Sequence, residues 1–110
     1  MNNINSVIID GTITTITKAD DQIALCLSVI RYYNAGDEVL KEENIFNIIA
    51  YGNLAKVNRD RLEVGREIRV VGRLRTVQYM ALPVPMVELI AEHIECLPDG
   101  KEEEDAEEET

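Results

Sequence analysis

Four tyrosines are the side chains of this sequence best suited to hold a flat ligand. The chain has no Trp, one Phe and four Tyr, namely Tyr32, Tyr33, Tyr51 and Tyr79. An aromatic ring offers an apolar face on which a nucleic-acid base can stack, and each stacked base is typically worth about 1–3 kcal/mol without sequence preference. The alternative for each tyrosine is a ring packed at the rim of the fold with its hydroxyl in water.

A basic stretch accompanies these rings although the whole chain is acidic. The net charge is −10, but the last twelve residues carry eight acids and one lysine, which leaves only −3 for residues 1–98. Residues 56–75 contain seven basic and three acidic side chains. Charges more than about 10 Å apart are largely screened at ordinary salt, so this local excess can attract phosphates. The alternative is a solvated face with scattered ion pairs.

The residues around these side chains predict a strand, a short helix and a second strand. Residues 45–51 are β-branched and aromatic, which is typical of a strand. Gly52 ends that strand, and Asn53 is a suitable N-cap for a helix over residues 53–63 that Gly65 closes. Residues 66–76 alternate with a period of two, which predicts a long strand. The expected apolar stripe of the helix is Leu54, Val57 and Leu62.

The remaining segments complete a chain of short elements. Strands are predicted at residues 4–17 and 22–33, followed by a loop over residues 34–43 in which Gly and Asn favour a turn. Two prolines within residues 80–85 interrupt backbone pairing. Residues 86–97 place apolar or neutral side chains at i, i+3, i+4, i+7, i+8 and i+11, and this spacing taken alone favours a helix.

In their order and spacing, four segments resemble the bacterial single-stranded-DNA-binding proteins. They are the opening strand at residues 5–11, the aromatic-Gly turn at residues 50–55, the Gly-rich strand at residues 65–76 and the closing segment at residues 88–97. The resemblance covers about residues 4–97. It implies an all-β OB-fold, a five-stranded Greek-key barrel with one short helix, in which residues 86–97 form a strand rather than a helix.

The resemblance also assigns roles to individual side chains. Tyr51 corresponds to the family's stacking aromatic before the turn glycine, Tyr79 corresponds to its stacking Trp, and one of Tyr32 and Tyr33 corresponds to the aromatic near the end of the second strand. The phosphate contacts we expect are Lys56, Arg59, Arg61, Arg69, Arg73 and Arg75, with Arg73 and Arg75 favoured because they lie on the long strand near Tyr79.

Three departures from the family pattern weaken the expected binding. Ile45 stands where the family often has a Trp, Asn53 where a Lys is common, and Val77-Gln78 where a basic pair is common. Each lost phosphate contact on a single strand reduces the salt slope by about 0.7, so we expect weaker and less salt-dependent binding than is typical of the family. Strand parity places Phe46 on the other face from Tyr51, so we expect Phe46 in the core.

Motifs for catalysis are missing from the sequence. No phosphate-cradling glycine loop ends in Lys-Ser or Lys-Thr, and no nucleophile elbow is present. His93 is the only histidine, and we expect it partly buried in the last strand or at a subunit contact. Cys26 and Cys96 lie in strand-like apolar sequence and are predicted to be small buried residues. We therefore expect no enzymatic activity, no metal site and no cofactor.

Length and composition indicate one domain and a tail. A chain of 110 residues with 45% apolar content fits one OB-fold domain at residues 1–98. Residues 99–110 have almost nothing to bury and repel themselves, so we expect a disordered acidic tail. The tail could compete with nucleic acid for the basic groove or simply aid solubility. It ends at Glu109-Thr110 without the small apolar tip by which family tails dock on replication and repair proteins.

Residues 1–98 are thus predicted to form a cytoplasmic protein that binds single-stranded DNA with little sequence preference during replication, repair or recombination. No leader peptide or membrane-spanning run is apparent, and we expect no membrane partner. The resemblance implies a homo-oligomer, typically a homotetramer, paired through strand edges such as Val7–Ile9. Two alternatives stay open: an oligomeric structural or protein-interaction OB module with weak or no nucleic-acid binding, which the absent Trp and the charge of −10 favour, and an accessory protein that binds RNA or helps restart replication.

Overall fold

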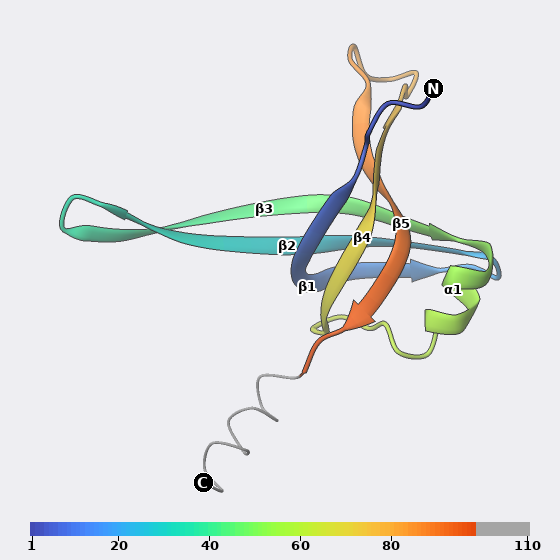
Figure 1. Ribbon diagram of the computed structural model, residues 1–110, viewed down its shortest axis with the longest axis horizontal. Coiled ribbons are helices and arrows are strands. Elements are labelled where there is room, and N and C mark those ends of the chain that lie inside the picture. Colours follow the sequence, from blue (N-terminus) through green and yellow to red (C-terminus); the bar gives the residue numbers. More distant parts are fainter. Residues whose placement is uncertain (99–110) are drawn as a thin grey trace, which may run out of the picture.

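Five strands and one short helix make up the computed structural model, which describes residues 1–98. The elements are β1 (Val7–Lys18), β2 (Gln22–Ala35), β3 (Glu38–Tyr51), α1 (Gly52–Asn58), β4 (Glu67–Val77) and β5 (Met86–Cys96). The strands pair in the order β1-β2-β3-β5-β4, and β4 pairs back with β1 to close a barrel (Figure 1). The predicted OB-fold barrel is confirmed. The predicted tail, residues 99–110, lies outside the described residues.

One strand, β1, closes the barrel by pairing with two neighbours. Its first half pairs with β4 and its second half with β2, and a bulge between Ile13 and Thr15 marks the change. Gly72 of β4 lies where strands approach so closely that a Cβ atom would meet the carbonyl of Ile90. The first strand begins at Val7 rather than Ile4, but Asn5 still extends the ladder, because its side chain exchanges two hydrogen bonds with the backbone of Leu74.

The interior is filled by aliphatic side chains from every strand. Among the large side chains that are almost completely buried, β1 contributes Ile13, β2 contributes Ile23 and Leu27, β3 contributes Ile48, and β4 contributes Ile68 and Val70. Leu62, from the segment after α1, covers one end of the barrel and is fully buried. Burying such side chains supplies most of the favourable free energy of a small domain. The barrel is therefore a filled scaffold that presents its outer faces to ligands.

Residues 86–96 form strand β5, so the helix that the apolar spacing favours is wrong and the strand implied by the resemblance is confirmed. The register moves from Val71↔His93 to Gly72↔Ala91, which leaves Glu92 as an extra residue in β5. This bulge shifts the phase of the strand, so that Ala91 and Ile94, three residues apart, both face the core. Ile90, on the outer face, is also buried. The bulge and the buried outer-face residue together explain why the apolar residues of this strand are spaced as in a helix.

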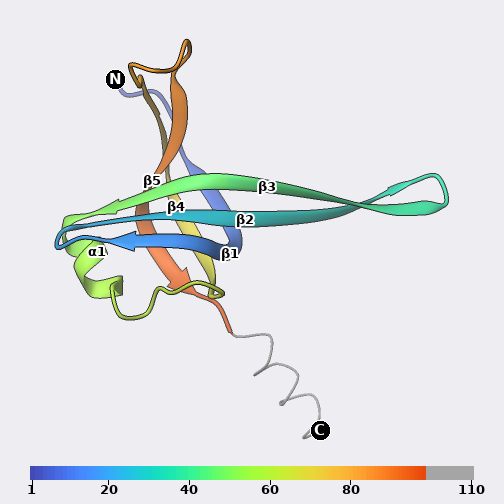
Figure 2. The ribbon, with the colours of Figure 1, turned by 180° about the vertical axis from the view of Figure 1, so that it is seen from behind.

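The loop predicted at residues 34–43 is instead the tip of a long hairpin. β2 and β3 pair without interruption from Gln22↔Tyr51 to Ala35↔Glu38, and Gly36 takes a positive φ of 66° in the turn. The hairpin extends well beyond the barrel, at the opposite end from α1 (Figures 1 and 2). Composition missed these strand ends because side chains there are exposed on both faces.

The helix is shorter than predicted and turns a different face inward. It ends at Asn58 rather than Glu63, and Tyr51 rather than Asn53 occupies the N-cap position. Ala55 and Asn58 are its buried residues, whereas Val57, expected in the apolar stripe, is 59% exposed. The Asn58 side chain donates a 2.9 Å hydrogen bond to the carbonyl of Leu54, which satisfies a polar group in the interface with the barrel.

Four smaller predictions about burial are also corrected. Phe46 has the parity of core residues, but it is 40% exposed because it lies where the hairpin leaves the barrel. His93 is exposed rather than partly buried within the strand, since it points outward beside the bulge of β5, and the alternative of a subunit contact stays a prediction. Cys26 and Cys96 are only half-buried.

Candidate nucleic-acid interface

A groove crosses the outer face of the barrel. Its volume is about 310 Å³, and it is lined by Thr15, Thr17, Ala24, Leu25, Cys26, Asn47, Ile48, Ile49, Tyr79 and Glu88. The lining comes from β1, β2, β3, β5 and the loop after β4, so the closed sheet sets its shape. Apolar side chains alternate with hydroxyl, amide and carboxylate groups along it. Such a surface can receive flat, partly polar ring systems.

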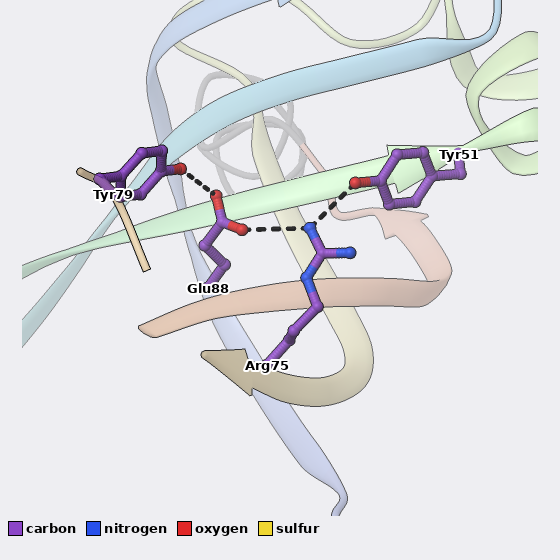
Figure 3. A network of polar contacts seen from close by, with 4 residues as sticks. All are labelled: Tyr51, Arg75, Tyr79 and Glu88. Atoms are coloured by element: carbon purple, nitrogen blue, oxygen red, sulfur yellow. Dashed lines mark hydrogen bonds and ion pairs between the residues drawn. The ribbon is translucent and has the colours of Figure 1, made fainter. Parts of the chain in front are cut away.

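Four side chains at this face form one polar network (Figure 3). The Arg75 guanidinium donates from Nη2 to the Tyr51 hydroxyl at 2.9 Å and to Glu88 Oε1 at 3.1 Å. The Tyr79 hydroxyl donates to Glu88 Oε2 at 3.2 Å. Two of the predicted stacking rings are thus connected through an arginine and a carboxylate.

Strand register explains why these residues meet. Arg75 of β4 and Glu88 of β5 are directly opposite partners in the antiparallel ladder. Tyr51 is the last residue of β3, which pairs with β5 through Ile48↔Leu89 and Ile49↔Ile90. The Arg75 guanidinium carbon also lies 5.6 Å from the centre of the Tyr51 ring, a cation–π distance. The barrel therefore brings together residues 37 positions apart in sequence, from Tyr51 to Glu88.

Glu88 is the buried member of the network, with only 6% of its surface exposed. An ionised carboxylate out of water is costly unless it is paired and hydrogen-bonded, and Arg75 and Tyr79 supply those partners. The negative charge of Glu88 is the main reason that the pKa of Tyr79 lies above its usual value. Hydrogen bonds to Tyr51 and then Glu88 raise the pKa of Arg75.

Tyr79 belongs to the loop between β4 and β5 rather than to a strand. Its ring is 45% exposed. The Gln78 amide donates to the carbonyls of Tyr79 and Leu82 at 3.3 and 3.0 Å, and the backbone N–H of Leu82 donates to the carbonyl of Tyr79 at 3.0 Å. These bonds fold the loop on itself. The contact between the Tyr79 hydroxyl and Glu88 then fastens the ring to the barrel.

Tyr32 and Tyr33 lie apart from this network, on the projecting hairpin. They are consecutive residues of β2 and so point to opposite faces. Tyr32 is 66% exposed, and Tyr33 lines a separate shallow hollow with Arg31 and Glu42. Residues 30–44 carry two basic and four acidic side chains. The hairpin thus offers exposed rings in an acidic setting.

The predicted phosphate contacts fall into three groups. Lys56 and Arg61 are exposed on α1 and the turn after it, while the Arg59 guanidinium donates to the carbonyl of Ala19 and so joins that turn to the β1–β2 connection. Arg73 is exposed on β4 and makes no hydrogen bond or ion pair within residues 1–98. Arg75 is engaged by Tyr51 and Glu88.

Arg69 occupies a different place. It forms a two-pronged ion pair with Asp10 at 2.7 and 2.9 Å, and the hydrogen bond from Arg69 holds the pKa of Asp10 below its usual value. Both residues border a hollow with Ile8, Ile9, Val29 and Val71, which shares no lining residue with the groove. The structure therefore separates Arg69 from Tyr51 and Tyr79.

Sequence reasoning missed Glu88 and the polar floor of the groove. Thr15, Thr17 and Asn47 alternate with core residues along their strands, a signal that shows only that one face is polar. Glu88 carries a stronger signal, since an acid stands between apolar residues in a segment that must close the barrel. Only the register reveals its partners.

Within residues 1–98, no group of three or more His, Cys, Asp or Glu side chains could hold a metal ion. The helix in that part of the chain is too short to span a bilayer.

Comparisons with known proteins agree with the barrel. A family model described as the single-strand binding protein family matches residues 4–97. No curated protein matches the sequence. Among solved structures, a Plasmodium falciparum SSB in complex with ssDNA superposes with a TM-score of 0.75 at 18% identity, covering 89% of this chain and 98% of that chain.

Two further solved structures share the fold. A deletion mutant of the single-stranded DNA binding protein from Thermus aquaticus gives a TM-score of 0.72 at 23% identity, covering 86% of this chain and 51% of that chain. The small single-stranded DNA-binding protein from Streptomyces coelicolor gives 0.68 at 20% identity, covering 88% and 95%.

Proposed function

Because the chain belongs to the single-strand binding protein family, we propose that it binds single-stranded DNA across the outer groove of the barrel, with little sequence preference and without catalysis. Bases stack on Tyr51 and Tyr79, and the neighbouring basic side chains contact phosphates. Stacking accepts every base because each has an aromatic face, which accounts for the low sequence preference.

The observation that carries this proposal is the polar network that joins Tyr51, through Arg75 and Glu88, to Tyr79. Tyr79 and Glu88 line the groove, and Tyr51 is joined to them through Arg75. Two exposed rings with hydroxyls held by the barrel form a platform for consecutive bases. Tyr32 and Tyr33, exposed on the hairpin, extend this path for a longer strand. The Plasmodium falciparum structure with ssDNA has the same barrel and supports the choice of ligand.

Phosphate contacts come from the basic side chains near the two rings. Arg73 lies two residues before Arg75 on the same face of β4, and Lys56, Arg59 and Arg61 lie on α1 and the turn that follow Tyr51. Arg69 lies beside Asp10, away from the groove. It can contact a phosphate only if the bound DNA also runs along that side of the barrel. Each phosphate neutralised on a single strand adds about −0.7 to the slope of log affinity against log salt.

In the cell we place the protein in the cytoplasm of a bacterium, where it protects single strands during replication, repair or recombination. We further propose a homo-oligomer, a tetramer in the simplest case, formed through the first strand. Ile8 is exposed there, with Val29 and Val71 beside it. Apolar side chains on an exposed sheet face favour pairing with a second copy. Replication or repair proteins are further candidate partners.

The test is fluorescence anisotropy with a labelled oligo-dT of about 35 nucleotides, long enough for several OB-fold sites. Titrations at low and moderate salt use a duplex of equal length as control. We expect tight binding to the single strand that weakens with salt, and little binding to duplex. An oligo-rU of the same length tests whether RNA is the preferred strand. Absence of binding to dT at low salt would refute the proposal.

A second candidate is an oligomeric protein-interaction module. The acidic hairpin and the buried carboxylate in the groove favour it, since both repel a polyanion. Such a module would still form the oligomer but bind neither oligonucleotide. The same titrations, run beside analytical ultracentrifugation, separate the two functions.

A further inference from the structure

We infer that Glu88 and Arg75 are positioning residues, which hold the hydroxyls of Tyr51 and Tyr79 so that both rings are fixed in place before a strand arrives. This inference rests on the proposed function and deepens it. Arg75 then links the two rings as well as being a candidate phosphate contact. Glu88 is added to the site although its negative charge repels DNA.

The hydroxyls are the first reason. Stacking needs only the ring, so Phe would serve as well as Tyr. Yet the Tyr51 hydroxyl accepts from Arg75 at 2.9 Å and the Tyr79 hydroxyl donates to Glu88 at 3.2 Å. The hydroxyls of Tyr32 and Tyr33 make no hydrogen bond within residues 1–98. The structure thus provides two tethered and two untethered tyrosines.

The burial of Glu88 is the second reason. Its outer-face neighbours Ile49 and Ile90 are buried and apolar, so an aliphatic residue would pack there at lower cost. A carboxylate at this point also disfavours an approaching phosphate backbone. Within residues 1–98, the polar partners of Glu88 are only Arg75 and Tyr79, so Glu88 does not offset these two costs by stabilising a distant part of the fold. Those partners are the contacts through which it acts.

The geometry of the loop is the third reason. Tyr79 follows the end of β4 at Val77 and receives no support from a strand ladder. Its hydroxyl contact crosses to β5, and the Arg75–Glu88 pair is itself a rung between β4 and β5. Fixing a side chain before binding avoids an ordering cost on binding. The network therefore couples a loop ring to a barrel ring and sets the distance between two stacked bases.

The experiment replaces each tyrosine by phenylalanine in the full chain and measures affinity for the labelled oligo-dT. Tyr51→Phe and Tyr79→Phe each weaken binding by about three- to tenfold, the cost of ordering one side chain. Tyr32→Phe and Tyr33→Phe, whose hydroxyls are untethered, are the comparison variants and should lose less affinity than either. Val84→Ala, an exposed change in the same loop as Tyr79, is the control and should bind as the wild type does. Equal affinity of Tyr51→Phe, Tyr79→Phe and the wild type would overturn the inference.

Glu88→Gln tests the carboxylate directly, because it removes the negative charge and keeps the size and shape of the side chain. We expect binding to fall about tenfold, and adding Glu88→Gln to Tyr79→Phe to cost little more, because the first change weakens and the second removes the same contact. Full additivity would show that Glu88 does not act through Tyr79. If Glu88→Gln fails to fold, the Tyr79→Phe result decides, since that variant leaves the buried carboxylate in place.

A readout without DNA separates this inference from the proposed function. Glu88 raises the pKa of Tyr79, so Glu88→Gln lowers that pKa, which ultraviolet titration of tyrosinate follows in the free protein. An unchanged titration would show that the network is absent in solution. If the wild-type protein binds no oligo-dT, the proposed function is wrong, and the role of Glu88 in binding is then wrong as well. If the wild-type binds and Glu88→Gln binds equally well, only the role of Glu88 fails.

Discussion

At the scale of single residues, the proposed binding face depends on a small number of rings and on what holds them. Tyr51 belongs to a strand of the barrel and Tyr79 to a loop, yet both lie within reach of Arg75 and Glu88. Since the chain has no Trp, the proposed binding mode gives each tyrosine a larger share of the stacking energy than in a protein with several large aromatic rings.

Removing either ring should therefore weaken binding strongly. We expect Tyr51→Ala and Tyr79→Ala each to cost about 1–3 kcal/mol in affinity for oligo-dT, the usual value of one stacked base. Val84→Ala, a change at an exposed residue of the same loop as Tyr79, is the control and should bind normally. Anisotropy titration measures all three, and a Tyr79→Ala protein as tight as the control would exclude stacking at that ring.

Arginines on the same strand should differ in salt dependence. Arg73 is exposed without a partner in residues 1–98, whereas Arg75 is held by Tyr51 and Glu88. Arg73→Gln should make the salt slope shallower by about 0.7, the contribution of one phosphate. Arg75→Gln should weaken binding at every salt concentration with a smaller change of slope. The reverse pattern would make Arg75 the main phosphate contact.

At the scale of elements, two features depend on backbone geometry rather than on side-chain chemistry. β4 and β5 approach closely at Gly72, and β2 and β3 continue into a hairpin whose outer part contains no buried side chain. The first feature is essential for barrel closure, and the second is separable from the barrel. Substitutions should affect them in opposite ways.

A methyl group at Gly72 should destabilise the barrel. Its Cβ would collide with the carbonyl of Ile90, and backbone atoms cannot move aside as a flexible side chain can. We expect Gly72→Ala to lower the free energy of unfolding by about 1–3 kcal/mol or more, as overpacking does. Urea unfolding followed by circular dichroism checks this, with Ala81→Gly in the exposed loop as a substitution of the same size. Equal stability of the two proteins would contradict the close approach.

Shortening the hairpin should leave the barrel intact. Replacing residues 31–42 by Asn-Gly joins Ile30 to Glu43, which are already paired, through a favoured two-residue turn. We expect the unfolding midpoint in urea to stay near that of the full protein, because every residue of the removed part is exposed. Binding to a long oligo-dT should weaken while binding to a short one should not. A large loss of stability would show that the hairpin supports the core.

At the scale of the whole molecule, charge is unevenly distributed along the chain. Residues 99–110 carry −7 of the total −10, and residues 56–75 carry +4. A tethered anion competes with DNA for basic side chains, because opposite charges attract over roughly a Debye length of about 10 Å.

Truncation after Pro98 should therefore tighten binding. We expect the gain to be several-fold at low salt and to vanish as salt screens the charges. Anisotropy titration of the truncated and full chains over a range of salt provides the measurement. A control chain whose six tail glutamates are exchanged for glutamine keeps the length and removes most of the charge. If the control binds like the full chain, the tail acts by bulk rather than by charge.

The sequence by itself determined the strands and the short helix and, through the resemblance carried by the order and spacing of its segments, the closed barrel and the candidate stacking rings. The strands and the helix depend on local information, namely β-branched runs, turn glycines and apolar spacing. Tyr51 and Tyr79 were identifiable because each follows a recognisable segment. The outer ends of β2 and β3 could not be predicted in this way. Paired residues there, such as Tyr33 and Leu40, are both exposed and therefore give no alternation of buried and exposed side chains.

Only the tertiary structure decided which side chains meet. In the sequence, Glu88 is only an acidic residue between apolar neighbours. The strand register shows that it lies opposite Arg75, and its carboxylate accepts a hydrogen bond from Tyr79. Arg69 and Arg75 share a strand face by parity, yet the closed barrel turns one toward Asp10 and the other toward Tyr51. Strand periodicity fixes the side of a sheet on which a residue lies. Contacts between distant residues depend on register, on the bulge at Glu92 and on the curvature of the barrel, which arise only when the chain closes on itself.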